Sequence, residues 1–82
     1  MKALIQEFSD YLRIEKRNSP HTVSAYRRDL SRFSAEFAGQ KVDSVTTANI
    51  RDFLISLREQ GLSPASVARS LSSIKSFFKY LC

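Results

Sequence analysis

The sequence has little cysteine, glycine or proline, and it has no tryptophan. Its 82 residues include one Cys, two Gly and two Pro. A single Cys excludes a disulfide framework and a zinc site built from cysteines. So few Gly and Pro exclude collagen-like and low-complexity chains. Apolar runs are too short to span a membrane, and Gln6, Glu7 and Asp10 interrupt any signal-peptide core near the start.

What the sequence does have is enough apolar residues for one core, together with an excess of positive charge. Hydrophobic residues make up 43% of the chain, and the length allows one small domain over residues 1–82. Thirteen Lys and Arg against eight Asp and Glu give a net charge of +5. We therefore expect a soluble, cytoplasmic domain with a polyanionic partner, no membrane partner and no small-molecule ligand.

Apolar residues recur at helical spacing along nearly the whole chain and predict four helices, near residues 3–16, 19–38, 47–60 and 64–82. Ser19–Pro20 and Ser63–Pro64 are start signals, because Ser caps free N–H groups and Pro has no hydrogen bond to lose in the first turn. Gly39 and Gly61 supply the residues that end helices. The predicted fold is all-α: a compact four-helix orthogonal bundle of two αα-hairpins.

The second and fourth expected helices resemble each other at an offset of 44 residues. Ser19, Pro20, Val23 and Leu30 fall on Ser63, Pro64, Val67 and Ile74, although the general rules of helix sequences explain this as well as duplication does. The apolar stripes predict a core made of Phe8, Leu12, Val23, Leu30, Phe33, Phe53, Leu57, Leu71, Ile74 and Phe78.

The residue types that catalysis or metal binding requires are scarce. His21 and Cys82 are the only soft metal ligands and lie far apart in the sequence, so no metal site is predicted. No His–Asp pair or nucleophile elbow is present, and no glycine-rich loop could hold a phosphate. We expect no catalytic residue, no metal and no cofactor in this chain.

Basic residues gather on the second and fourth expected helices. Residues 20–38 and 64–82 hold six Lys and Arg against two acids, so they carry +4 of the net +5. Thr22 and Ser66 lie in first turns, where free N–H groups and the helix dipole favour a phosphate. A helix face that is merely solvated should carry charges of both signs, as the first expected helix does, whereas a face of one sign, rich in Arg, Lys, Ser and Thr, suits contact with DNA phosphates. The candidate DNA-binding residues are His21, Thr22, Ser24, Arg27, Arg28, Arg32, Ser66, Arg69, Ser72, Lys75, Ser76 and Lys79.

Two ordered sets of residues resemble the N-terminal core-binding domain of tyrosine recombinases, the phage integrases and the Xer type. The first set is Glu15–Lys16, Ser19–Thr22, Tyr26–Leu30 and Phe33. The second set, preceded by weaker matches at Thr46, Ile50, Phe53–Leu54, Gly61, Ser63 and Ser66, is Arg69, Leu71–Ser72, Lys75–Phe78 and Tyr80–Leu81.

The resemblance implies a SAM-like helical fold that forms one arm of a C-shaped clamp on double-stranded DNA. It implies contact with the major groove and its flanking phosphates through the second and fourth helices, and contact with other recombinase protomers through the first. It places catalysis in a separate domain with an Arg/Lys/His set and a Tyr nucleophile. Because the apolar stripe of the fourth helix runs to the last residue, we expect this domain beyond residue 82 of a longer parent protein. The present chain is then not itself an enzyme.

Two other functions are compatible with a small helical domain. A helical protein-interaction module without nucleic-acid binding would expose an apolar patch or charges of both signs, and only Ile14 and Ile55 could point outward. A helix-turn-helix repressor needs a short recognition helix after a tight turn, which the long helices fit poorly.

Overall fold

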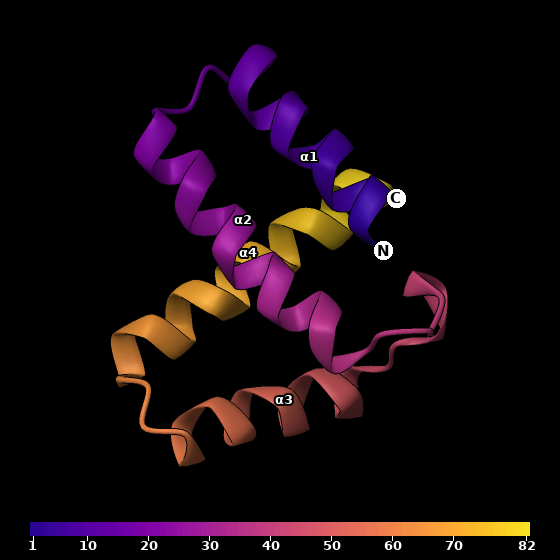
Figure 1. Cartoon of the computed structure of the whole chain (residues 1–82), viewed down its shortest axis with the longest axis vertical. Helices are drawn as coiled ribbons and strands as arrows, with labels where there is room; N and C mark the ends of the chain where they lie inside the picture. Colours follow the sequence, from indigo (N-terminus) through magenta and orange to yellow (C-terminus); the bar gives the residue numbers. More distant parts are fainter.

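The computed structural model describes residues 1–82 and contains four α-helices and no strand (Figure 1). These are α1 (Lys2–Ile14), α2 (Pro20–Glu36), α3 (Thr47–Glu59) and α4 (Pro64–Leu81), with a short 3₁₀ turn, η1 (Val42–Ser44), before α3. The all-α prediction is confirmed, and the predicted helix ends differ from these by no more than two residues. None of the helices is long and apolar enough to cross a membrane.

Side-chain caps begin three of the helices. Ser19 Oγ accepts a hydrogen bond from the Thr22 N–H at 3.2 Å, and Ser63 Oγ accepts one from the Ser66 N–H at 3.2 Å. Helix α3 begins with a reciprocal capping box, in which Thr46 and Asn49 each accept from the other's backbone N–H. These caps satisfy N–H groups that a helix start otherwise leaves free, which fixes where each helix begins.

The helix ends depend on residues with positive φ. Gly39 and Gly61 adopt φ values of 85° and 98°, as the sequence predicts. Helix α1 ends differently, because Arg17 takes the left-handed conformation with φ 52° and the Asn18 N–H donates to the Leu12 carbonyl at 3.0 Å. A non-glycine residue seldom adopts this conformation, so the sequence holds no signal for this turn.

Helices α2 and α4 cross steeply near their middles, and the other two helices pack around this crossing (Figure 1). Helix α1 lies along α2 and touches α4, while α3 packs against α4. The core between them is apolar and rich in phenylalanine: Phe33 is fully buried, and its ring centroid lies 5.0 Å from that of Phe37 and 5.5 Å from that of Phe53. The buried apolar residues are Ile5, Phe8, Leu12, Val23, Leu30, Phe33, Phe37, Phe53, Leu57, Ile74 and Phe77.

The predicted orientation of α4 is wrong by part of a turn. Leu71 and Phe78 are only partly buried, whereas Ser70, Ser73 and Phe77 are fully buried; the other eight predicted core residues are buried as expected. Apolar periodicity could not find this orientation, because part of the face that α4 turns inward is made of serine. Small serine side chains let α4 approach α2 closely, and Ser73 finds a polar partner there.

The different burial of two leucines predicts different effects on stability. Leu30→Ala empties a site that is fully buried and should lower the free energy of unfolding by about 3–5 kcal/mol. Leu71→Ala removes a side chain that is already partly exposed and should cost about 1 kcal/mol. Urea unfolding followed by circular dichroism measures both, and equal losses would contradict the observed orientation of α4.

Candidate nucleic-acid interface

Helix α2 exposes cations that no acidic side chain neutralises. Arg28 is exposed and Arg32 is half-buried, and neither forms an ion pair within the chain. Because these residues are four positions apart, one helical turn separates their guanidinium groups along the same side of α2. His21 and Ser24 are exposed on the turns before them. The structure therefore leaves this part of the predicted site free to bind an anion.

Helix α4 exposes a second set of cations. Lys75 and Lys79 are exposed and unpaired, and Ser72, about one turn before Lys75, is exposed as well. Ser76 is half-buried and lines a groove together with Lys79 of α4 and Tyr26 of α2. Four cations of the two crossing helices have neither an ion pair nor a side-chain hydrogen bond within the chain, and we call these unpaired cations the basic surface: Arg28, Arg32, Lys75 and Lys79.

Arg27 is oriented differently from its neighbour. Its Nη2 donates a hydrogen bond to Gln6 Oε1 at 3.1 Å, so the guanidinium leans toward α1. The bond joins two elements that are separated by 21 positions in the sequence and helps to hold α1 against α2. Arg27 keeps its charge beside the basic surface, but part of its hydrogen-bonding capacity is used inside the chain.

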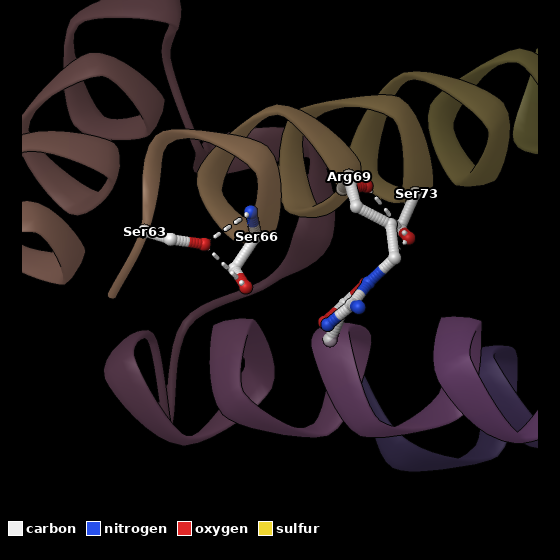
Figure 2. A network of polar contacts seen from close by, with 5 residues as sticks. Ser63, Ser66, Arg69 and Ser73 are labelled. Carbon is white, nitrogen blue, oxygen red and sulfur yellow. Dashed lines mark hydrogen bonds and ion pairs between the residues drawn. The ribbon is translucent and has the colours of Figure 1, made fainter.

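Arg69, predicted to lie on the outward face of α4, is tied to an acid at the crossing of α2 and α4. Its Nε and Nη2 donate to the two oxygens of Asp29 at 3.0 and 3.1 Å. The Asp29 side chain is 0% exposed and that of Arg69 is 43% exposed. Figure 2 shows Arg69 reaching from α4 toward α2, with Ser73 one turn further along α4. The guanidinium therefore covers a buried carboxylate and presents its other side to solvent.

Ser73 is the third member of this network. Its hydroxyl lies 3.0 Å from Asp29 Oδ2 and 3.1 Å from the Arg69 carbonyl oxygen, so it can donate to either. The hydrogen bond and the negative charge of Asp29 raise the pKa of Arg69 above its ordinary value, against a smaller opposing effect of burial. A raised pKa keeps the Arg69 guanidinium positively charged throughout the physiological pH range.

The two predicted first-turn phosphate ligands are not free in the way that the sequence suggests. The Thr22 N–H donates to Ser19 and the Ser66 N–H donates to Ser63, as Figure 2 shows for the second pair. The Thr22 and Ser66 hydroxyls also lie 3.0 and 3.1 Å from those of the capping serines. The caps already satisfy these N–H groups, so the contribution of both residues to anion binding is reduced to their hydroxyls.

Sequence reasoning gave Asp29 no structural role, although it counted Asp29 among the acids of α2 and within the set Tyr26–Leu30 that carries the family resemblance. The available signal was its position, since Asp29 falls on Ser73 at the offset of 44 that relates α2 to α4. Burial of Asp29 also changes the charge of the surface, because Glu36 is then the only exposed acid on α2 and α4. The structure contains no cluster of three or more His, Cys, Asp or Glu side chains that could hold a metal ion.

Comparison with known proteins gives one family for this chain. The model of the family described as "Phage integrase, N-terminal SAM-like domain" matches residues 5–82. Curated relatives include tyrosine recombinase XerC of Oceanobacillus iheyensis, 42% identical over 99% of this chain and 28% of the relative. XerD of Staphylococcus haemolyticus is 37% identical over 98% of the chain and 28% of the relative. XerC of Alcanivorax borkumensis is 38% identical over 94% of the chain and 25% of the relative. No solved structure gives a significant match.

The two ion pairs of the chain should differ in their effect on stability. Arg69→Ala leaves the buried Asp29 without its counter-charge and should cost about 2–3 kcal/mol, less than a fully enclosed pair because water reaches Arg69. Arg13→Ala breaks the exposed pair with Asp10 on α1 and should cost less than about 0.5 kcal/mol. Denaturant midpoints of the two variants test this, and equally small losses would show that the buried pair is not needed.

Proposed function

The chain belongs to the family of phage integrase N-terminal SAM-like domains, and from this premise we propose that it is the DNA-binding, core-binding domain of a tyrosine recombinase of the Xer type. It binds double-stranded DNA through α2 and α4, as one arm of a clamp around the recombination site. The observation that carries this proposal is the basic surface. Four unpaired cations lie on the two crossing helices, and only one exposed acid accompanies them.

The physical argument is one of charge and donors. DNA binding requires cations that are not already neutralised within the protein, because their pairing with phosphates releases counterions from the DNA. Arg28, Arg32, Lys75 and Lys79 meet this requirement, and the exposed His21, Ser24 and Ser72 add short polar groups beside them. Side chains of this kind position a protein on the phosphate backbone.

The chain spans about a quarter of the length of the curated relatives that it matches. We place catalysis in a separate domain of the parent protein, and we assign contacts with other recombinase protomers to the assembled protein. The three tyrosines of this chain have packing roles: Tyr11, Tyr26 and Tyr80 surround Phe8, with ring centroids 6.4, 6.4 and 5.3 Å from it.

A protein-interaction module receives less support. The exposed large apolar side chains are Ile14 and Ile55, which are 60% and 52% exposed and lie on different helices, α1 and α3. Interface cores depend on contiguous apolar or aromatic anchors, and two separate isoleucines do not supply them. The unpaired cations on α2 and α4 would also remain without a role.

Binding of a mixed-sequence DNA duplex should be weak and strongly dependent on salt. With about four or five phosphates contacted, log affinity should fall against log salt with a slope of about −4. The dissociation constant should lie in the non-specific range of about 10⁻⁴–10⁻⁶ M. Replacing Arg28 and Arg32 together by Ala should weaken binding and flatten the slope to about −2, because two contacts are lost. Fluorescence anisotropy at several salt concentrations measures both quantities.

The matched control changes the net charge by the same amount on the other two helices. Arg13 on α1 and Arg51 on α3 are exposed, and their joint replacement by Ala should leave the salt slope nearly unchanged. Arg58 is less suitable, because its guanidinium donates to the Leu62 carbonyl at 2.9 Å. Equal losses of affinity in the two double variants would show that α2 is not part of the DNA-binding surface.

We also expect the chain alone to neither cleave nor join DNA. Incubation with supercoiled plasmid carrying the recombination site of the parent protein should give no nicked circles and no covalent protein–DNA adduct on denaturing gels. The tyrosines pack against Phe8, and we place the Arg/Lys/His set of the family's catalytic domain in the separate domain of the parent protein. An adduct through any of the three tyrosines would place catalysis inside this domain.

A further inference from the structure

Asp29 is the one acid of α2 and α4 that lies against a candidate DNA-binding cation. Its carboxylate is completely buried, yet the guanidinium that it holds is 43% exposed. An ion pair required only for packing could be replaced, both partners together, by apolar side chains of similar volume, which is often neutral or stabilising. The geometry of the network shows what else Asp29 does.

The carboxylate fixes one edge of the Arg69 guanidinium and leaves another edge free. A guanidinium has five N–H donors in one plane. Asp29 accepts one hydrogen bond from Nε and one from Nη2, so both N–H groups of Nη1 and one of Nη2 have no partner in the chain. These free donors form a second planar fork, directed away from the buried carboxylate. A planar fork of this kind binds two phosphate oxygens, or O6 and N7 of a guanine.

We infer that Asp29 is a positioning residue for DNA binding, which holds the free edge of Arg69 in a fixed orientation for paired acceptor atoms of the DNA. This inference rests on the proposed function and identifies a residue that contributes to DNA binding without touching the DNA. Ser73 supports the arrangement, since its hydroxyl can donate to Asp29 Oδ2 and so restricts the carboxylate. Arg69 then meets the DNA with most of its side-chain freedom already lost, which lowers the entropic cost of binding.

The direction in which one substitution changes DNA affinity distinguishes a positioning role of Asp29 from a purely electrostatic effect. Asp29→Asn removes a negative charge beside the basic surface, taking the net charge from +5 to +6. If charge alone mattered, this substitution would tighten binding to DNA. If Asp29 positions Arg69, it weakens binding, because the amide offers one acceptor where the carboxylate offered two.

The experiment compares the two ion pairs of the chain by fluorescence anisotropy on one mixed-sequence duplex. Asp29→Asn and Arg69→Lys alter the pair at the crossing, while Asp10→Asn and Arg13→Lys make the same changes of charge and shape in the exposed pair on α1. We expect Arg69→Lys to weaken binding about fivefold or more and Asp29→Asn about twofold or more. Asp10→Asn should tighten binding slightly and Arg13→Lys should leave it unchanged.

A second measurement does not require the variants to fold. In the unaltered protein the Arg69 Nε–H proton is held by Asp29, so its nuclear magnetic resonance signal should be protected from exchange with water. That protection should persist when duplex is added, while the chemical shift of the signal changes.

Repeating the anisotropy on duplexes with and without guanine distinguishes phosphate oxygens from guanine as the acceptors that Arg69 binds. If Arg69 contacts phosphate, Arg69→Lys should weaken binding to both duplexes equally. If Arg69 contacts guanine, Arg69→Lys should weaken binding only to the duplex that contains guanine.

The outcomes distinguish this inference from the function on which it rests. If the unaltered protein binds no duplex, the proposed function is wrong. If it binds and Asp29→Asn folds and tightens binding as Asp10→Asn does, only the positioning role is wrong. If Arg69→Lys binds as tightly as the unaltered protein, Arg69 does not touch the DNA and its pair with Asp29 is purely structural. An Arg69 Nε–H signal that exchanges freely with water would also contradict the positioning role.

Discussion

The buried carboxylate of Asp29 constrains how α2 and α4 cross, and the rest of the domain packs around this crossing. A buried charge is costly unless it is paired, so α4 must present partners to α2 at the depth of Asp29. Arg69 and Ser73 supply them with three polar contacts of 3.0–3.1 Å. Apolar packing alone would tolerate other rotations of α4, since Leu71 and Phe78 could replace Ser70 and Phe77 in the core. The polar network selects one of them.

The same constraint divides the cations of α2 and α4 into two kinds. Arg69 is held in place from within, with part of its hydrogen-bonding capacity used by Asp29. Arg28, Lys75 and Lys79 are exposed and unpaired, and in the proposed function they follow the phosphates of any DNA sequence. Flexible cations supply affinity that does not depend on sequence, whereas a fixed planar fork can demand particular geometry from its acceptors. In the proposed function, one buried acid is therefore enough for a small domain to combine both kinds of contact.

The sequence was sufficient to locate the four helices but not to predict which face α4 turns toward the core. Ser–Pro starts, glycine ends and apolar spacing located all four helices, because these signals act within a few residues of each helix. The orientation of α4 depends on a contact between positions 44 residues apart, which helix periodicity cannot contain. For the same reason the two arginines Arg28 and Arg69 looked alike in the sequence, although only one is paired. The turn at Arg17 was missed because its positive φ has no glycine to announce it.

The similarity of α2 and α4 at an offset of 44 residues gives a physical reason for the position of the network of Asp29, Arg69 and Ser73. Helices α2 and α4 begin with the same capped Ser–Pro turn, and they cross where Asp29 meets Ser73, its counterpart at an offset of 44. Two similar helices that cross at corresponding positions would present like residues to each other. Two acids at that point would repel, and two serines would leave the exposed guanidinium of Arg69 without an anchor. With an acid on one helix and a serine on the other, the Ser73 hydroxyl can donate to the Asp29 carboxylate. Both carboxylate oxygens also accept hydrogen bonds from Arg69 and orient its guanidinium. The asymmetry between two otherwise similar helices is thus the feature that gives the domain a directed cation at its centre.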